Sequence, residues 1–299
     1  MNAAHIKRIA SEVGFDACGV ARADALTDEE YPLREWLRLG WHGDLGYMER
    51  NVEKRMDPRV LLPGARTVIC LLRGYNPDTP IAENTPKIAR YAYGEDYHDI
   101  IRPMLYELRE RLGISGKICC DTVPISDKHW AARAGLGWIG RHTLLVTHDW
   151  GTWVNLGEIV TTEECDEYDD EHSGHLLANP CTHCNRCVDA CPNGALAKEG
   201  APMLDVRRCT AYHTIESHSA TLPQDLDTGG YVFGCDICQQ ACPYNHHPLK
   251  SRPIEQRSTA MLSSLAGMDD ESFADATRGT PLSRITHSQW LRNIGHATE

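Results

Sequence analysis

The chain has 299 residues, 13 of them cysteines, and a formal net charge of −12. This length allows about two domains. The acidic total excludes a protein that coats nucleic acid by bulk electrostatics, because such binding depends on many lysine and arginine contacts with phosphate; a local basic patch is still compatible with it. Neither a signal segment, a twin-arginine leader nor a membrane-spanning apolar run is recognisable, so we expect a cytoplasmic protein without a membrane partner.

Hydrophobic periodicity predicts a mixed helix and strand domain in the first half of the chain. In chain order we expect a helix at 3–13, a strand at 15–21, a helix at 29–39, a strand at 67–72, a helix at 97–112, a strand at 117–121, a helix at 127–134, and strands at 143–147 and 153–161. Gly113 is the expected C-cap of the helix at 97–112. Because some of these strands follow one another directly, the pattern favours an α+β sandwich over a strictly doubly wound sheet.

A glycine-rich turn follows the helix expected at 127–134. Gly135, Gly137 and Gly140 would let the backbone approach a large planar ligand closely, and Trp138 offers a flat apolar wall. An ordinary exit from a helix into a strand explains the same pattern equally well. The domain contains no dinucleotide fingerprint and no phosphate loop.

The segment before the cysteine-rich region is acidic, and we expect it to be a solvated connecting loop. Its charged residues are Glu163, Glu164, Asp166, Glu167, Asp169, Asp170 and Glu171. Five cysteines outside the cysteine-rich region are expected to be small buried hydrophobes. They are Cys18, Cys70, Cys119, Cys120 and Cys165.

Two cysteine runs carry most of the chemical information. The first has the spacing Cys-x2-Cys-x2-Cys-x3-Cys-Pro and starts at Cys181; the second, Cys-x2-Cys-x3-Cys-Pro, starts at Cys235 and is one cysteine short. In two-cluster bacterial ferredoxins, three close cysteines hold one cubane and the cysteine before proline ligates the other. Cys209 is the natural replacement for the missing ligand. We therefore assign two [4Fe–4S] clusters, one to Cys181, Cys184, Cys187 and Cys242, the other to Cys209, Cys235, Cys238 and Cys191.

The alternatives for the cysteines are a zinc site and a disulfide scaffold. Zinc modules usually show paired Cys-x2-Cys knuckles and have no use for a Cys-x3-Cys-Pro ending. Disulfides are rare in the compartment expected for this chain. Both alternatives are therefore less favoured than iron–sulfur clusters.

Several motifs together resemble one known family. They are Asp121-Thr122-Val123-Pro124, residues 130–143, Leu156-Gly157-Glu158-Ile159, and upstream residues 46–58, 63–69 and 90–98. With the cysteine runs, they resemble the epoxyqueuosine reductases, which are cobalamin- and iron–sulfur-dependent tRNA modification enzymes. The resemblance covers roughly residues 5–245 and reaches residues 280–293.

This resemblance implies a fold, a domain division and an activity. We expect a nitroreductase-like cobalamin-binding domain of α+β class at 1–165, a ferredoxin-like domain with two [4Fe–4S] clusters at 166–250, and a short α-helical, HEAT-like segment at 251–299. The implied reaction, the last step of queuosine biosynthesis, reduces epoxyqueuosine to queuosine at the wobble position of tRNA. Many members continue into a longer helical array, so we expect either a compact member or one lacking part of its tRNA platform.

The implied partners are tRNA carrying epoxyqueuosine in its anticodon loop and an external one-electron donor such as a flavodoxin or ferredoxin system. We expect the protein to be a monomer. Because the total charge is acidic, tRNA should dock on a local basic surface. We expect that surface to draw on Arg207, Arg208, Lys250, Arg252, Arg284 and Arg292.

The resemblance also implies site residues. Asp121, at a strand end facing the corrin, is the expected proton donor to the departing epoxide oxygen, with a pKa raised by burial. The alternative is that Asp121 merely caps the following turn, a common role of aspartate. The expected cofactor contacts are Arg55, Tyr97, His98, Gly137, Trp138, Ile139, Gly140 and Arg141.

Two of these assignments stay open, and two histidines are left out as cobalt ligands. Arg55 and Arg141 either anchor the periphery of the corrin or form surface salt bridges. We do not assign His98 or His142 as an axial ligand of cobalt, because a lone histidine is more often a satisfied structural residue.

Two other functions compete with epoxyqueuosine reduction. A reductive dehalogenase shares the cobalamin-plus-ferredoxin plan, but such enzymes usually carry a twin-arginine leader and a tyrosine donor, whereas Asp121 stands at the donor position here. A plain iron–sulfur electron carrier would need no large domain ahead of its clusters. The 165 residues before the cysteine-rich region argue against it.

Overall fold

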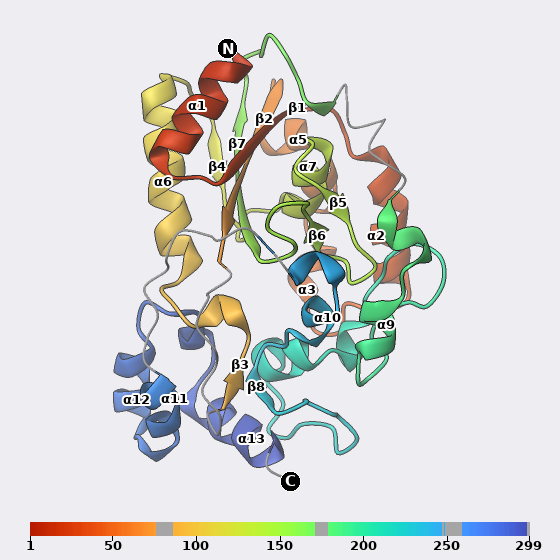
Figure 1. Cartoon of the computed structure of the whole chain (residues 1–299), viewed down its shortest axis with the longest axis vertical. Helices are drawn as coiled ribbons and strands as arrows, with labels where there is room; N and C mark the ends of the chain where they lie inside the picture. Colours follow the sequence, from red (N-terminus) through yellow and green to blue (C-terminus); the bar gives the residue numbers. More distant parts are fainter. Residues whose placement is uncertain (76–85, 171–178, 247, 249–258, 298–299) are drawn as a thin grey trace.

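The computed structural model describes residues 1–75, 86–170, 179–246, 248 and 259–297 (Figure 1). Glu171, Lys250 and Arg252, which are named above, lie outside the described residues. The upper half of the molecule in Figure 1 contains a β-sheet with its helices, and the C-terminal helices lie at the opposite end. Along the described part of the chain, no helix combines the length and the apolarity needed to cross a membrane.

A four-stranded antiparallel sheet forms the centre of the N-terminal part. Its strand order is β1 (Ala17–Arg22), β2 (Thr67–Gly74), β7 (Val154–Thr161) and β4 (Lys117–Cys119). Antiparallel pairing holds between all neighbours in this sheet. The prediction of an α+β architecture is therefore confirmed.

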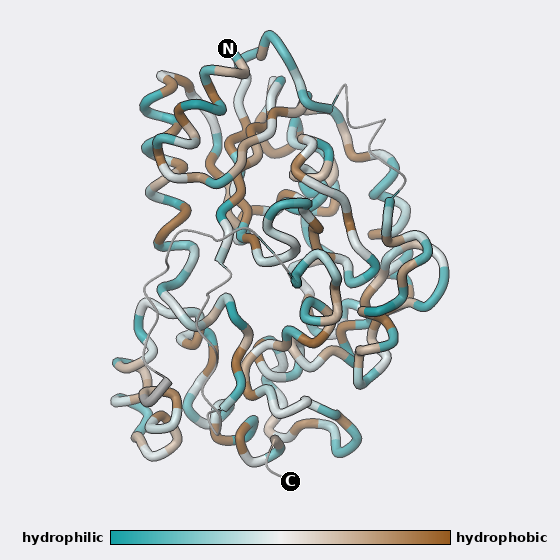
Figure 2. The backbone as a smooth tube through the Cα atoms, in the orientation of Figure 1, coloured by the Kyte–Doolittle hydropathy of each residue, from teal (hydrophilic) through white to brown (hydrophobic). Residues whose placement is uncertain are grey.

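Helices cover both faces of this sheet. Ile69 and Leu71 of β2 point into a core shared with α1 (Ala3–Val13) and α6 (Tyr97–Leu112). Val68 and Cys70 point to the opposite face, where α7 (Asp127–Arg133) packs. This two-residue alternation is what a strand buried between two helical layers requires. Figure 2 shows the result, with the hydrophobic colour concentrated along the central strands.

The remaining α-helices and strands have the following bounds. Those of the N-terminal part are α2 (Thr27–Arg38), α3 (Gly46–Glu49), α4 (Val52–Met56), α5 (Pro58–Leu61), β3 (Lys87–Ile88), β5 (Trp138–Ile139) and β6 (Leu145–Val146). Those that follow are α9 (Arg186–Ala190), β8 (Tyr231–Phe233), α10 (Ile237–Gln240), α11 (Thr259–Ser264), α12 (Asp270–Thr277) and α13 (His287–Ala297).

The long predicted helices agree with the structure, and the strand ends differ. The helices expected at 3–13 and 97–112 have those bounds, and Gly113 is the left-handed C-cap of α6 with φ 63°. The strand expected at 117–121 stops at Cys119, because Asp121 has a φ of 56° that no strand accommodates. Cys70, Cys119 and Cys120 are at most 2% exposed, which confirms that they are buried.

The C-terminal helices share a core with residues from both other parts of the chain. β3 pairs in parallel with β8, and Ile88 and Phe233 of this pair are fully buried. Trp290 of α13 packs into the same core and is also fully buried. The segment around β3 thus joins the C-terminal core and not the central sheet, although the sequence division assigned it to the N-terminal domain.

The acidic segment differs from the prediction of a solvated loop, because part of it closes the free edge of β1. The Asp169 carboxylate accepts a hydrogen bond from the Val20 backbone N–H at 2.8 Å, and the Asp169 N–H donates to the Val20 carbonyl at 2.8 Å. Asp170 accepts from the Arg22 N–H at 3.2 Å. Covering an edge strand in this way blocks pairing with another chain.

We predict that Asp169→Ala destabilises the protein. The variant loses the bond to Val20 and the 2.6 Å ion pair with Lys7. A hydrogen bond to a charged group contributes about 1.5–3 kcal/mol, and the half-exposed ion pair adds little. Thermal unfolding under anaerobic conditions measures the loss. Glu167→Ala, in an exposed residue of the same segment, is the control and should leave the midpoint unchanged; equal midpoints for both variants would contradict the role of Asp169.

Candidate functional site

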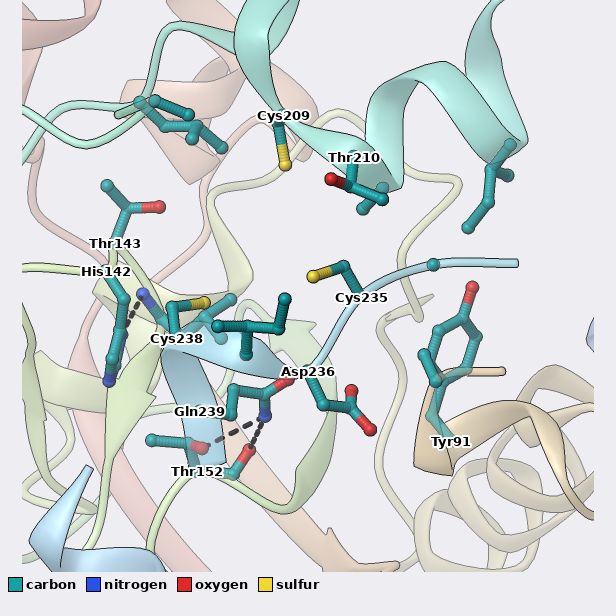
Figure 3. Close-up of a pocket in the computed structure, with 18 of the residues that line it drawn as sticks. Tyr91, His142, Thr143, Thr152, Cys209, Thr210, Cys235, Asp236, Cys238 and Gln239 are labelled. Carbon is teal, nitrogen blue, oxygen red and sulfur yellow. Dashed lines mark hydrogen bonds between the residues drawn. The ribbon is translucent and has the colours of Figure 1, made fainter. Parts of the chain in front are cut away.

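A cavity of 420 Å³ lies between the sheet domain and the cysteine-rich segment (Figure 3). One wall consists of Cys191, Cys209, Cys235 and Cys238. The other walls come from the first residues of β7, from the loop between β5 and β6, and from aromatic and basic side chains. These residues include Tyr91, Tyr97, Lys128, His142, Thr143, Leu144, Val154, Leu156 and Arg284. The cavity is therefore mostly apolar, with a group of thiols in one wall and a few polar groups in the others.

Cysteines of the two runs lie close to one another: Cys181 and Cys242 pack at one small apolar core, and Cys191 and Cys238 pack against another that contains Cys187. Burial is the main cause that raises the pKa of Cys238, followed by the neighbouring Cys209, Cys235, Cys187 and Cys191. In the other set, Cys181 and Cys184 raise the pKa of both Cys187 and Cys242, again after burial. Cys242 thus lies near cysteines of the first run, and Cys191 lies near Cys238 of the second run and Cys187 of its own. Their ligation of clusters stays a prediction, which this grouping supports.

All thirteen cysteines are free, so the disulfide scaffold is excluded as the structure of this chain. The two sets also differ in their surroundings. Thr182, His183, Asn185 and Arg186, in the loop that carries the first set, are exposed. The second set faces the cavity. An electron entering at the surface would therefore meet the first set before the second.

The glycine-rich turn packs against protein and not against the cavity. A Cβ at Gly137 would lie 2.1 Å from the Val146 carbonyl oxygen, and one at Gly140 would lie 2.7 Å from the His142 ring. These glycines allow β5 and β6 to pair closely. Trp138 points away from the cavity, and its Nε1–H donates to the Cys181 sulfur at 3.3 Å. The expectation that Gly137, Trp138 and Gly140 line a planar ligand is not met in this structure.

Asp121 belongs to a charged network at the start of α6. Its Oδ2 lies 3.3 Å from Nε2 of His98, whose Nδ1 lies 2.7 Å from Oδ1 of Asp96. His98 is thus held between two carboxylates. The Tyr97 ring stacks on the His98 ring at 4.2 Å. Arg284 reaches this network from the C-terminal segment and donates to the Tyr97 hydroxyl at 3.2 Å.

The network reverses the expected protonation of Asp121. Its interaction with His98 lowers the pKa of Asp121, and this effect outweighs the burial that was expected to raise it. Burial alone would lower the pKa of His98, but Asp121 and Asp96 together raise it. The proton of the pair therefore resides on His98, and Asp121 is a carboxylate. The Asp121 side chain faces His98, so the alternative that it caps the following turn is not favoured.

A buried carboxyl pair lies behind Asp121 and was not predicted. Glu158 on β7 is fully buried, and burial raises its pKa well above the usual range. Burial also raises the pKa of Asp127 to about 6, and the two carboxyls interact. The Asp121 backbone N–H interacts with the Asp127 carboxylate. This contact helps to hold the left-handed backbone of Asp121, which a non-glycine residue adopts only under constraint.

A second cavity of 200 Å³ adjoins the first and shares Lys128, Thr143 and Leu204 with it. Arg55 and Ile139, two of the expected cofactor contacts, line this second cavity. Nε of Arg55 is buried with no hydrogen-bond partner among the described residues, and its Nη2 donates to the Tyr47 carbonyl at 3.1 Å. The alternative of a surface salt bridge for Arg55 is therefore not favoured.

His142 lines the large cavity, a placement that sequence reasoning left unassigned. Its Nδ1 accepts a hydrogen bond from the Leu144 N–H at 3.2 Å. Burial, followed by the nearby Lys128 charge, lowers the pKa of His142 to about 4. The neutral ring therefore carries its proton on Nε2, which is buried and has no partner among the described residues. Such a nitrogen is a hydrogen-bond donor and not a metal ligand.

Several arginines have different roles from those expected. Arg141 donates to the Ala197 carbonyl at 2.9 Å, which ties the β5 turn to the cysteine-rich segment. Arg292 donates to the carbonyls of Ser217 and His213, so it anchors α13. Arg284 lines the large cavity. Arg284 and Arg292 thus make contacts within the protein, and Arg207 pairs with Asp205 at 2.8 Å. The basic surface for tRNA stays a prediction.

Family models match two segments of the chain. Residues 180–245 match the "4Fe-4S double cluster binding domain". Residues 55–123 match "Epoxyqueuosine reductase QueG, DUF1730". The first match covers both cysteine sets and favours iron–sulfur over zinc. The second ends just after Asp121 and contains Tyr97 and His98.

Curated relatives and solved structures cover nearly the whole chain. Epoxyqueuosine reductase of Gloeobacter violaceus is 38% identical over 99% of this chain and 95% of its own length, and that of Cyclobacterium marinum is 36% identical over 97% and 94%. The Streptococcus thermophilus structure has a TM-score of 0.82 at 25% identity and covers 98% of this chain and 80% of that one. An epoxyqueuosine reductase structure with an epoxyqueuosine-modified tRNA-Tyr stem loop has a TM-score of 0.81 at 26% identity, with the same coverage.

A Bacillus subtilis structure, described with its catalytic aspartate loop swung out of the active site, has a TM-score of 0.79 at 25% identity over 98% of this chain and 80% of that one. The fold is thus shared with proteins whose identity to this chain is modest. Identity of 36–38% over nearly full length identifies the family. The chain belongs to the epoxyqueuosine reductase family.

Proposed function

We propose that this protein reduces epoxyqueuosine in tRNA to queuosine. The reaction takes two electrons and two protons, and converts the epoxide into an alkene and water. The observation that carries the proposal is one cavity with four thiols on one side and the Tyr97 and Arg284 side chains of the Asp121 network on another. This arrangement supplies electrons and protons to the same place. The stem-loop complex of a relative supports tRNA as the substrate.

Nucleoside analysis of tRNA tests this function. A strain that lacks its own epoxyqueuosine reductase accumulates epoxyqueuosine, and expression of this chain should convert it to queuosine. Unchanged epoxyqueuosine, with the chain expressed and its clusters intact, would contradict the proposal. Cobalamin uptake by the purified protein separates an enzyme from a plain electron carrier, because a carrier has no use for the corrin.

The cavities fit the cobalamin that the family implies. The large cavity offers the apolar walls Leu144, Val154 and Leu156 to a flat ring. Its polar atoms without a protein partner, such as His142 Nε2, suit the amides around a corrin. Arg55 Nε, in the adjoining cavity, is another polar atom that could bind such an amide. Cobalamin supplies a low-valent cobalt that can deliver electrons to carbon, which no side chain can do.

The residues of the Asp121 network supply protons. Asp121 is the group that hands a proton to the epoxide oxygen, because an alkoxide leaves poorly at neutral pH. His98 lies 3.3 Å from it and holds the proton in the resting protein, so His98 can load Asp121. Asp96 keeps the His98 ring in place, as the orienting carboxylate of a triad does. Reloading through His98 provides the second proton.

Finer features of the family complete the proposal. We take the N-terminal part, 1–165, as nitroreductase-like and cobalamin-binding, 166–250 as the two-cluster domain, and 251–299 as a short helical repeat segment. The electrons come from an external one-electron donor such as a flavodoxin or ferredoxin. The protein works as a monomer in the cytoplasm. The exposed loop of the first cysteine set is the natural entry point for electrons.

Asp121→Asn should abolish turnover without damaging the protein. The amide keeps the shape of the acid but cannot donate an acidic proton, so pre-reduced enzyme should lose about 10²–10⁴-fold in single-turnover rate. Cobalamin uptake, both clusters and tRNA affinity should stay near the parent values. Thr122→Val, in the adjacent residue, is the control. A near-parental rate for Asp121→Asn would remove this carboxylate from the mechanism.

His98 should impose a pH dependence on the reaction. Because its pKa is raised, His98 is protonated below that pKa and loses its proton above it. The single-turnover rate should therefore hold below the raised pKa of His98 and fall as the pH rises through it. His98→Gln should be slower and lack this alkaline decline. An unchanged pH profile in the variant would show that the proton comes by another route.

Cys191 and Cys242, which each precede a proline, should each ligate the cluster held by the other cysteine run. Cys191→Ala should damage the cluster of Cys209, Cys235 and Cys238, and Cys242→Ala should damage the cluster of Cys181, Cys184 and Cys187. Iron counting and electron paramagnetic resonance of each variant measure this. Loss of the cluster formed by the same run, with the other intact, would refute the assignment. Cys70→Ala, in a buried cysteine of the sheet, should leave both clusters unchanged.

A further inference from the structure

Trp138 makes a side-chain contact with a cysteine of the first set, which was not expected from the sequence. Its indole Nε1 lies 3.3 Å from Sγ of Cys181, within the range of an N–H to sulfur hydrogen bond. The residue is only 9% exposed. An indole nitrogen can only donate, so the sulfur is the acceptor. The bond therefore directs a positive dipole at this sulfur from the sheet domain.

The surrounding structure fixes the indole in this position. Trp138 pairs with Val146 in the β5–β6 hairpin. Its ring centroid lies 4.9 Å from those of both His148 and Tyr244. Trp138, Val146 and Cys242 share one small apolar core, with Cys181 packed against it. The indole thus contacts two cysteines of the same set, one from each cysteine run.

A second contact holds the hairpin to the same loop. Asn179 donates from Nδ2 to the Ile139 carbonyl at 3.2 Å. Its Oδ1 accepts from the Cys181 N–H at 2.9 Å. The distance between Trp138 and Cys181 is therefore set by the backbone on both sides. The hydrogen bond is a built feature of the interface between the hairpin and the cysteine loop.

The other cysteine set receives a different kind of donor. The Ala195 backbone N–H donates to Sγ of Cys191 at 3.3 Å. This bond comes from the main chain and survives side-chain substitution. A change at Trp138 thus removes a donor from the first set and leaves the donor of the second set in place. The second set is an internal reference for any experiment on the first.

We propose that Trp138 tunes the first [4Fe–4S] cluster, raising its reduction potential through the hydrogen bond to Cys181. One electron from the external donor takes this cluster from the 2+ to the 1+ state, which adds negative charge to the cluster and its sulfurs. A donor aimed at a ligand sulfur stabilises that added charge, so it favours the reduced state. The inference rests on the two-cluster part of the proposed function and adds a residue that neither the family models nor the cysteine spacing assigns.

The tuning matters because of the order of the two clusters. The first set lies under an exposed loop, whereas the second lines the cavity. The first cluster must accept an electron from outside before the second can receive it. A lower potential at the first cluster would leave it more often oxidised at a given donor potential. Trp138 therefore acts on electron entry and does not touch the substrate.

Trp138→Phe tests the proposal, because phenylalanine keeps an aromatic ring and removes the N–H. We expect the reduction equilibrium of the first cluster to shift roughly tenfold towards the oxidised state, about 59 mV for one electron. The potential of the second cluster should not change. The readout is electron paramagnetic resonance at controlled potentials, with no tRNA present. Trp36→Phe is the matched control, since it removes an indole bond of 2.6 Å to the Leu204 carbonyl and no bond to sulfur.

An unchanged first potential, or an equal shift of both potentials, would overturn the proposal. If Trp138→Phe loses the first cluster, the parent protein still provides a test. Labelling tryptophan with ¹⁵N should produce a nitrogen coupling, and deuterated solvent should remove a proton coupling, in the spectrum of the reduced first cluster. Absence of both couplings would also overturn the proposal. Failure of epoxyqueuosine reduction would show instead in the tRNA nucleosides, so the two failures are distinguishable.

Discussion

The convergence of eight thiols from separated stretches of chain is the constraint on which the rest of this structure depends. In the predicted ligation each set of four takes one cysteine from the other run, so each cubane needs both runs. The two runs must therefore fold together, next to the large cavity. The hairpin of β5 and β6 contacts the cysteine-rich segment through Trp138 of β5 and through Arg141 in the loop between the two strands. These contacts tie the sheet domain to that segment.

Charge placement around Asp121 is the second organising feature. The Asp121 side chain is 58% exposed, and His98 lies between it and Asp96. This arrangement lowers the pKa of Asp121 and raises that of His98, so it favours the proton on His98. Arg284 braces the network from the C-terminal segment, and the Asp96 N–H donates to the Gly279 carbonyl at 2.9 Å. The C-terminal segment is thus part of the site.

How far the site could be predicted depends on whether its contacts are local. The assignment of the cysteines to two sets rests on ligand spacing along the chain, which is a local signal, and it stays a prediction. The helix starting at Tyr97 was predicted because its apolar period and glycine cap are local signals. The cofactor contact of Trp138 stays a prediction; the structure adds an indole bond to the Cys181 sulfur, which the sequence of a glycine-rich turn does not indicate. The glycines were needed for strand pairing with Val146.

The sequence by itself determined the family, because the motifs that identify it are contiguous or regularly spaced; the two cysteine sets and the role of Asp121 as the acid stay predictions. Only the tertiary structure decided the protonation of Asp121, the orientation of Trp138 and the placement of Arg284 inside the cavity. The physical reason is that a pKa and a hydrogen bond depend on groups that meet in space. Tyr97 and Arg284 are 187 residues apart in the chain and 3.2 Å apart in the site.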